Sequence, residues 1–387
     1  MKRKGTVVVL HLAFRYPFAG VVWQLLHHLV GFRELGLDVY YIEDHRAWVY
    51  DALAATPTKD PSGNLRTVGA VLDRWGFAGR WAFLDGERDE YIGMGRTKCL
   101  ELIGSADAVV NLCGATHPRE EHMHSRLIYL ETDPGVFQTM LDRGDPNSKN
   151  LAAAHQLFFT YGYDIGEPHC VIPTGGLDWR KTRPPVLLDA WRPGIGPASP
   201  RSFTTVGTWQ NKGNDIDIAG DRYFWSKHVN FEKALDVARR ADQPIELATD
   251  LNSGPAYERA IGGGFSFRPA IPMSLDVDAY REYVSSSRGE FTVSKDLYVR
   301  THSGWFSDRT VCYLAAGRPV VTQFTGFENH ITTGEGLLGF HNADDAVEAI
   351  RAVNADYPRH ARAARAIAVE YFDAHKLLDE IAMAAGI

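Results

Sequence analysis

The feature that most constrains this chain is a repeated alternation of apolar, β-branched strands with amphipathic helices. A strand is predicted at 6–10, a helix from about 21 to 35 that stops at Gly36, and a second strand at 38–42. Further strands are predicted at 108–112, 126–130 and 157–160. Strands that alternate with helices in this way form an open parallel sheet covered by helices. The first half of the chain is therefore predicted to be a Rossmann-like α/β domain.

The second half repeats the alternation after a stretch rich in Pro and Gly, which has neither strand nor helix periodicity. Its predicted strands are 202–206, 245–248, 264–267, 290–293 and 319–323, and its predicted helices are 231–240, 277–286, 308–316 and 343–354, followed by a long amphipathic end at 359–384. We expect a first domain at 1–172, a linker at 173–200, a second domain at 201–370, and a last helix at 371–387 that crosses back to the first domain. Two such halves face each other across a cleft.

Length, charge and cysteine content narrow the function. A chain of 387 residues suits two domains, and a formal net charge of −7 disfavours a nucleic-acid partner, because phosphate contacts need a basic surface. No run approaches the roughly 20 apolar residues of a membrane span, and we expect a cytoplasmic protein. The four cysteines are scattered, which predicts neither a zinc site nor a disulfide framework. The expected partners are small molecules, and a homodimer is left open.

The segment 295–327 carries the most chemistry. A polar loop enters a predicted helix, with Ser307 at the N-cap position and Gly317 as the stop. The start of such a helix presents free N–H groups and the positive end of the helix dipole, which suits a diphosphate. Arg300, His302 and Arg309 add charged donors in the same place.

Two pieces of this segment resemble the donor-binding signature of nucleotide-sugar-dependent glycosyltransferases of the GT-B superfamily. The run His302-Ser303-Gly304-Trp305-Phe306-Ser307 is similar to its HxGWxS opening, and Ala316-Gly317-Arg318-Pro319-Val320 is similar to its closing G-x-P-V. The resemblance implies that His302, Gly304 and Ser307 hold the donor diphosphate and that Thr325 and Gly326 contact the sugar. It implies a UDP-, GDP- or dTDP-sugar as co-substrate, with no tightly bound cofactor and no metal. The E-x7-E pattern of the retaining relatives is absent, because its positions hold Gly304 and Cys312; the nucleotide and the stereochemistry stay open.

Further candidates come from positions after predicted strands, where an α/β sheet places its ligands. Gly207, Lys212 and Lys295 are candidates for the donor site. An inverting transfer also needs a general base. The residues that follow first-half strands and qualify as that base are His11, Asp44, His45 and Asp133.

Other patterns have a simpler interpretation. His117, Glu120, Glu121, His122 and His124 crowd one segment, but their spacing fits no metal motif and indicates a solvated loop. Gly334, Gly336 and Gly339 have dinucleotide-binding spacing without the β-α-β context that such a site needs. The predicted function is glycosyl transfer to an unidentified acceptor, with a nucleotide-sugar epimerase or a non-catalytic sugar-nucleotide- or glycan-binding protein as alternatives.

Overall fold

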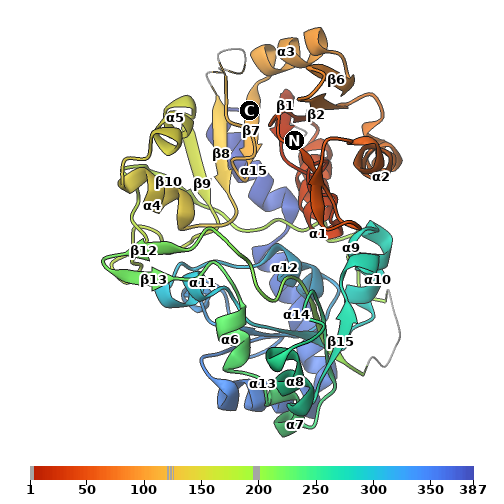
Figure 1. The fold of residues 1–387 in the computed structure, drawn as a ribbon, viewed down its shortest axis with the longest axis vertical. Helices are drawn as coiled ribbons and strands as arrows, with labels where there is room; N and C mark the ends of the chain where they lie inside the picture. Colours follow the sequence, from red (N-terminus) through yellow and green to blue (C-terminus); the bar gives the residue numbers. More distant parts are fainter. Residues whose placement is uncertain (1–3, 120–121, 123, 125, 195–200) are drawn as a thin grey trace.

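The computed structural model describes residues 4–119, 122, 124, 126–194 and 201–387, and its strands form one large sheet in each half of the chain (Figure 1). The first sheet has the spatial order β10 (Trp179–Lys181), β9 (Leu157–Thr160), β8 (Leu127–Glu131), β7 (Ala108–Leu112), β1 (Thr6–Leu10), β2 (Asp38–Glu43), β5 (Trp81–Asp85) and β6 (Glu90–Gly93). Its strands pair in parallel except for β6, which runs antiparallel to β5. The predicted Rossmann-like first half is thus confirmed.

The second sheet is parallel throughout. Its order is β15 (Phe265–Pro269), β14 (Ile245–Thr249), β11 (Phe203–Val206), β16 (Gly289–Thr292), β17 (Val320–Gln323) and β18 (Leu337–Phe340). Two antiparallel hairpins stand apart from the sheets: β3 (Val49–Asp51) with β4 (Thr56–Thr58), and β12 (Ile216–Ile218) with β13 (Asp221–Tyr223). Both hairpins were missed in the sequence because their strands have only three residues each.

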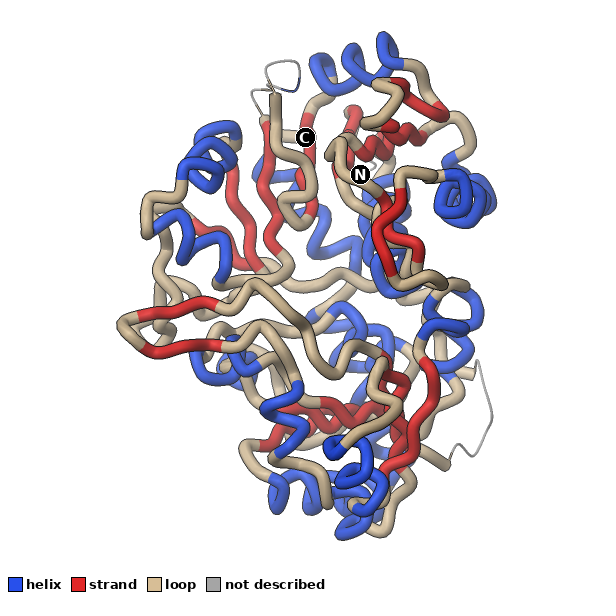
Figure 2. The backbone as a smooth tube through the Cα atoms, viewed as in Figure 1, coloured by secondary structure: helices blue, strands red, loops and turns tan. Residues whose placement is uncertain are grey.

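Helices flank the strands of both sheets (Figure 2). Those of the first half are α1 (Ala19–Glu34), α2 (Ser62–Leu72), α3 (Arg96–Ser105), α4 (Val136–Asp142) and α5 (Pro146–Ala154). Those of the second half are α6 (His228–Glu232), α7 (Val237–Ala241), α8 (Pro255–Gly262), α9 (Ile271–Ser274), α10 (Val277–Ser285), α11 (Asp296–Thr301), α12 (Asp308–Ala315), α13 (Ala343–Ala355), α14 (Tyr357–Tyr371) and α15 (Ala374–Ala385). Within the described ranges, no helix has both the length and the apolar character needed to cross a bilayer.

The central strands show why the apolar runs of the sequence become sheet. Every residue of β7 and β8 is buried, and so are all residues of β1 after Thr6. Strands of a parallel sheet are covered by helices on both faces, so they need continuous apolar runs and not an alternating pattern. The β-branched residues that fill β1 also favour the extended backbone.

Two expectations about chain boundaries need correction. The first sheet extends into the predicted linker, because β10 pairs with β9, and residues 195–200 of that linker lie outside the described residues. The predicted helix 231–240 is two short helices, α6 and α7, and the long C-terminal end breaks into α14 and α15. The second break has a local cause: the Asp373 carboxylate accepts the N–H of His375 and caps α15.

The chain crosses twice between the halves, and the two crossings run side by side. Val186, which follows β10, donates its N–H to the Phe372 carbonyl and accepts the N–H of Ala374. After this crossing, α15 packs against α1 of the first half. Gly31 of α1 permits the close approach, since a Cβ there would lie 2.4 Å from Cδ1 of Leu378.

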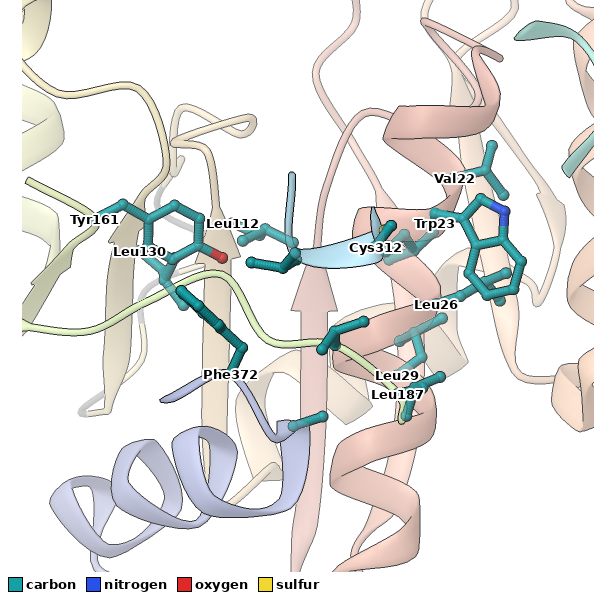
Figure 3. Packing of buried hydrophobic residues seen from close by; sticks show 14 of the residues in the cluster. Val22, Trp23, Leu26, Leu29, Leu112, Leu130, Tyr161, Leu187, Cys312 and Phe372 are labelled. Carbon is teal, nitrogen blue, oxygen red and sulfur yellow. The ribbon is translucent and has the colours of Figure 1, made fainter. Parts of the chain in front are cut away.

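One cluster of buried apolar side chains continues from the first half into the second (Figure 3). It joins Trp23 and Leu26 of α1 to Cys312 of α12 and to Phe372 at the second crossing. Trp23 also donates its indole N–H to the Val277 carbonyl at the start of α10 (2.9 Å). Burial of a shared apolar surface therefore fixes the two sheets relative to each other.

The contact between α15 and α1 gives a testable expectation for stability. Replacing the fully buried Leu378 by Ala should lower the free energy of unfolding by about 2–5 kcal/mol, because it leaves a cavity against α1. Met383 lies on the same helix with 58% of its surface exposed, so Met383→Ala should change the free energy of unfolding by less than about 0.5 kcal/mol. Urea unfolding of both variants measures this; equal losses would contradict the packing described.

Candidate functional site

A cleft of about 1110 Å³ lies between the two sheets. Its walls come from the segments that follow strands β1, β8, β11, β14 and β15, and from the starts of α1 and α12. These are the carboxyl ends of parallel strands, where open α/β sheets bind their ligands. Pockets for small ligands usually have about 300–1,000 Å³, so the cleft has room for two small molecules at once.

The start of α12 provides the cationic end of the cleft. Asp308 and Arg309 in its first turn line the cavity. The Arg309 guanidinium is held in place by Glu290 (2.5 Å), by the Val206 carbonyl (2.9 Å) and by the Thr292 hydroxyl (3.0 Å). The residue before the helix is Ser307, as predicted, although its side chain makes no capping bond. A fixed guanidinium at a helix N-terminus is suited to an anion.

Lys227 is the site residue that sequence reasoning missed. It is buried, and its ammonium has no hydrogen bond or ion pair with the described residues. A Cβ on Gly207 would lie 3.3 Å from Nη1 of Arg309 and 4.0 Å from Nζ of Lys227, so both cations flank the backbone at Gly207. Burial, together with the nearby Arg309 guanidinium, holds the pKa of Lys227 well below its ordinary value. A buried ammonium without a partner is costly unless an anion binds beside it.

The position of Lys227 explains why its pattern was not recognised. It stands twenty residues beyond Gly207, and the hairpin β12–β13 lies between them. The one feature near Lys227 that the sequence could have offered is the short helix α6, which begins at His228, directly after this lysine.

Asp133 lies on the cleft wall two residues after β8 and is paired with residues of the second half. Its carboxylate accepts hydrogen bonds from Lys295 Nζ (2.8 Å) and from the Tyr298 hydroxyl, and 48% of its side chain remains exposed. Burial alone would raise the pKa of Asp133, but the Lys295 ammonium and these hydrogen bonds hold it below the ordinary value. Lys295 also lies 3.3 Å from the ring centroid of Trp225. Asp133 is thus ionised and accessible, and the Lys295 ammonium is ion-paired with it.

Two of the other three candidate bases, His11 and Asp44, do not line the cleft. His11 is fully buried, its Nε2 lies 3.0 Å from Gln24 Oε1, and burial lowers its pKa to about 3. Asp44 is buried in a cluster with Arg119 (2.8 Å), His122 (3.0 Å) and Tyr91. Neither lines the cavity, so we no longer consider either as the base.

The cluster around Asp44 also corrects the interpretation of 117–124 as a solvated loop. His122 is 1% exposed and bonded to Asp44, whereas Glu120 and Glu121 lie outside the described residues. His45 bonds the buried Glu43 (2.7 Å) and likewise does not line the cleft. In the part of the chain that the structure describes, no group of three His, Cys, Asp or Glu side chains could hold a metal ion.

The motif residues before α12 lie at the contact between the two halves and not in the cleft. His302 is exposed in a left-handed turn (φ 49°) that ends α11, and Arg300 bonds the Arg222 carbonyl and Asp296. A Cβ on Gly304 would lie 2.7 Å from the Asp164 backbone nitrogen. Gly304 therefore lies at the contact between the halves, whereas Arg300 bonds within the second half and His302 is exposed. None of the three lines the cleft, so their assignment to the donor site stays a prediction that this geometry does not support.

The remaining donor-site candidates also differ in whether they line a cavity. Thr325 is buried and donates to the Trp305 carbonyl, and a Cβ on Gly326 would strike the Asp164 carboxylate. Lys212 is exposed and does not line the cleft. Ser307 lines a small cavity with Lys227 and Arg309. Of the predicted donor residues, Gly207, Arg309 and Ser307 are thus brought together.

Gln24 and Asp308 join the two walls of the cleft. The Gln24 amide nitrogen donates to Asp308 Oδ2 (3.0 Å), while Oδ1 of Asp308 has no partner. Burial, with a smaller contribution from the charge of Asp133, raises the pKa of Asp308 to about 7. Asp308 is therefore a carboxyl group that is partly protonated at neutral pH.

Solved glycosyltransferase structures share this fold over their whole length. AviGT4, a glycosyltransferase involved in avilamycin A biosynthesis, matches with a TM-score of 0.58 at 12% identity, over 98% of this chain and 97% of that one. HepE of Anabaena, solved with UDP and glucose, matches at 0.56 and 12% identity over 99% of both chains. An alpha-glucosyltransferase in complex with UDP-glucose and DNA containing an abasic site matches at 0.58 and 11% identity, also over 99% of both. No protein-family model and no curated protein sequence matches the chain. The predicted GT-B fold is confirmed.

The raised pKa of Asp308 predicts a pH-dependent stability. The folded state keeps a proton that an unfolded carboxyl (pKa 3.8) releases, so the free energy of unfolding falls as pH rises from about 4 to about 7. In Asp308→Asn the amide oxygen can still accept the hydrogen bond from Gln24, but the side chain cannot ionise. Its stability relative to the wild type should therefore increase across this window, by on the order of a few kcal/mol.

Urea unfolding at pH 4.5 and pH 8 measures the difference. Glu348→Gln, which removes an exposed carboxylate on α13, serves as the control and should keep the pH dependence of the wild type. Parallel curves for Asp308→Asn and the wild type would show that Asp308 is ionised throughout.

Proposed function

We propose that this protein is a glycosyltransferase that moves a sugar from a nucleotide-sugar donor to a small acceptor. The observation that carries the proposal is the buried Lys227, which lines a small cavity with Arg309 and Ser307 at the start of α12 and lies behind the cleft wall at Gly207. The donor diphosphate would neutralise the charges of Lys227 and Arg309. Its oxygens would accept hydrogen bonds from the free N–H groups at the start of α12. Two proteins of the same fold support a nucleotide-sugar as the ligand, since HepE was solved with UDP and glucose and the alpha-glucosyltransferase with UDP-glucose.

The transfer requires one bond to form and one to break. The acceptor hydroxyl oxygen bonds to the anomeric carbon of the sugar, the bond from that carbon to the β-phosphate oxygen breaks, and the nucleoside diphosphate leaves with the electron pair. Lys227 and Arg309 stabilise the charge that develops on the leaving group. The hydroxyl proton passes to Asp133, which faces Lys227 closely enough for each charge to shift the pKa of the other.

Several broader expectations belong to the same proposal. The domain boundary falls between β10 and β11, and residues 371–387 return to the first domain. We infer a cytoplasmic protein whose acceptor is not nucleic acid, because the net charge of −7 repels phosphates. The alpha-glucosyltransferase of the same fold was solved with DNA, so transfer to DNA is among the outcomes to be tested. A homodimer stays a prediction.

Lys227→Met tests the anion site. It keeps the length of the side chain and removes the charge, so UDP should bind about 10–100-fold more weakly, as measured by titration calorimetry. Lys233→Met removes an exposed charge at the residue that directly follows α6 and should leave UDP affinity within about twofold. Equal affinity of the wild type and Lys227→Met would move the diphosphate elsewhere.

Asp133→Asn tests the base. The amide cannot take the hydroxyl proton, so kcat should fall by about 10²–10⁴-fold, while UDP should bind at least as tightly because one negative charge is lost near Lys227. The assay follows radiolabelled UDP-, GDP- and dTDP-glucose with and without a panel of hydroxyl acceptors. An isomerised free donor would identify an epimerase, and tight donor binding without any turnover would identify a binding protein.

A further inference from the structure

The wall of the cleft that belongs to the first half is mostly apolar. Its apolar lining residues include Leu12, Phe18, Val21, Tyr50, Ala52 and Leu53. They come from the end of β1, the start of α1, and the β3–β4 hairpin. The rings of Phe18 and Tyr50 lie against each other, with centroids 5.9 Å apart, and join the helix to the hairpin.

Leu53 stands at the edge of this wall with 80% of its surface exposed. The turn that carries it is held by Asp51, whose Oδ1 accepts the N–H groups of Leu53 (2.9 Å) and Ala54 (3.0 Å). The leucine is thus kept in a defined place beside a cavity while its apolar surface faces water. A ligand that covered it would gain from removing that surface from water.

Charged and polar groups on this wall are confined to the neighbourhood of the second half. Among the described lining residues of the first half, Asp133 is the one Asp, Glu, Lys or Arg, and it is paired with Lys295. Gln24 is engaged with His11 and Asp308, and Cys113 lies 3.1 Å from the Thr132 hydroxyl. A sugar or a phosphate backbone would leave many of its polar groups without partners against such a wall, which is costly.

We propose that the acceptor is a flat, predominantly apolar molecule with an aromatic or fused-ring body and a hydroxyl group at one end. The inference rests on the proposed function and specifies its second substrate. The body lies between Phe18, Tyr50 and Leu53, and the hydroxyl points to Asp133 and the anomeric carbon. The sugar is joined to the acceptor oxygen, the nucleoside diphosphate is released, and the hydroxyl proton goes to Asp133. The volume of about 1110 Å³ accommodates this molecule beside the donor.

The test uses 4-methylumbelliferone, a flat phenol whose fluorescence reports binding without any reaction. With UDP present, the wild type should bind it in the micromolar range, and Leu53→Asp should bind it at least tenfold more weakly, because a carboxylate replaces the apolar contact. Leu53 is exposed, so this change does not disturb the core. Met383→Asp, at another exposed apolar position on α15 that does not line the cleft, should leave binding unchanged.

The outcomes separate this inference from the proposed function. Transfer of sugar to 4-methylumbelliferone, lost in Leu53→Asp while UDP affinity is kept, supports both. Leu53-dependent binding of the phenol without any transfer supports the apolar subsite and overturns the transferase. Transfer to maltose or to a short DNA duplex, with no binding of the phenol, overturns the apolar acceptor and leaves the transferase standing. Phenol binding that is equal in the wild type and Leu53→Asp also overturns the inference.

Discussion

A buried lysine whose charge is only partly compensated is the constraint on which the proposed site depends. Arg309 is ion-paired with Glu290, whereas Lys227, buried beside it, makes no such pair among the described residues, and the charges of Glu290 and Asp133 offset only part of the cost of burial that lowers its pKa. Burying a charge is tolerated only when a counter-charge is available. The protein keeps this charge where the backbone at Gly207 and the start of α12 meet the cleft. The ligand that completes the electrostatics therefore has to be an anion that reaches both cations.

The two halves meet in a way that suits a ligand held between them. Trp23 of α1 bonds Val277, Gln24 bonds Asp308, and Lys295 bonds Asp133, so polar links cross the boundary at several points around the cleft. The two crossings of the chain are also bonded to each other at Val186. These links act together with the shared apolar cluster, so the two halves are held in one arrangement around the cleft.

The sequence predicted the fold well and the site only in part, for physical reasons. The apolar runs of β1, β7 and β8 identify buried parallel strands because burial on both faces leaves no room for polar residues. Lys227 could not be assigned, since an inserted hairpin separates it from Gly207 and only the fold brings them together. His302 was misplaced because a motif gives residue types and not backbone direction, and its left-handed conformation leaves it exposed at the end of α11. Asp133 was named as a candidate because it stands two residues after a strand, and the structure places it on the wall of the cleft, while its role as the base stays a prediction.

The charged residues of the cleft are divided unevenly between its two walls, and under the proposed function this asymmetry would orient the two substrates. The second half contributes the cations and the start of α12, and the first half contributes the apolar ring wall with Asp133 at its inner edge. An anionic donor and an apolar acceptor would each be stable on one wall and poorly solvated on the other. Their reactive ends are then brought together only near Asp133, where both walls meet. The uneven distribution of charged residues would thus orient the donor and the acceptor, which the shape of the cleft alone would not do. Two neutral substrates of similar size would bind either wall equally well.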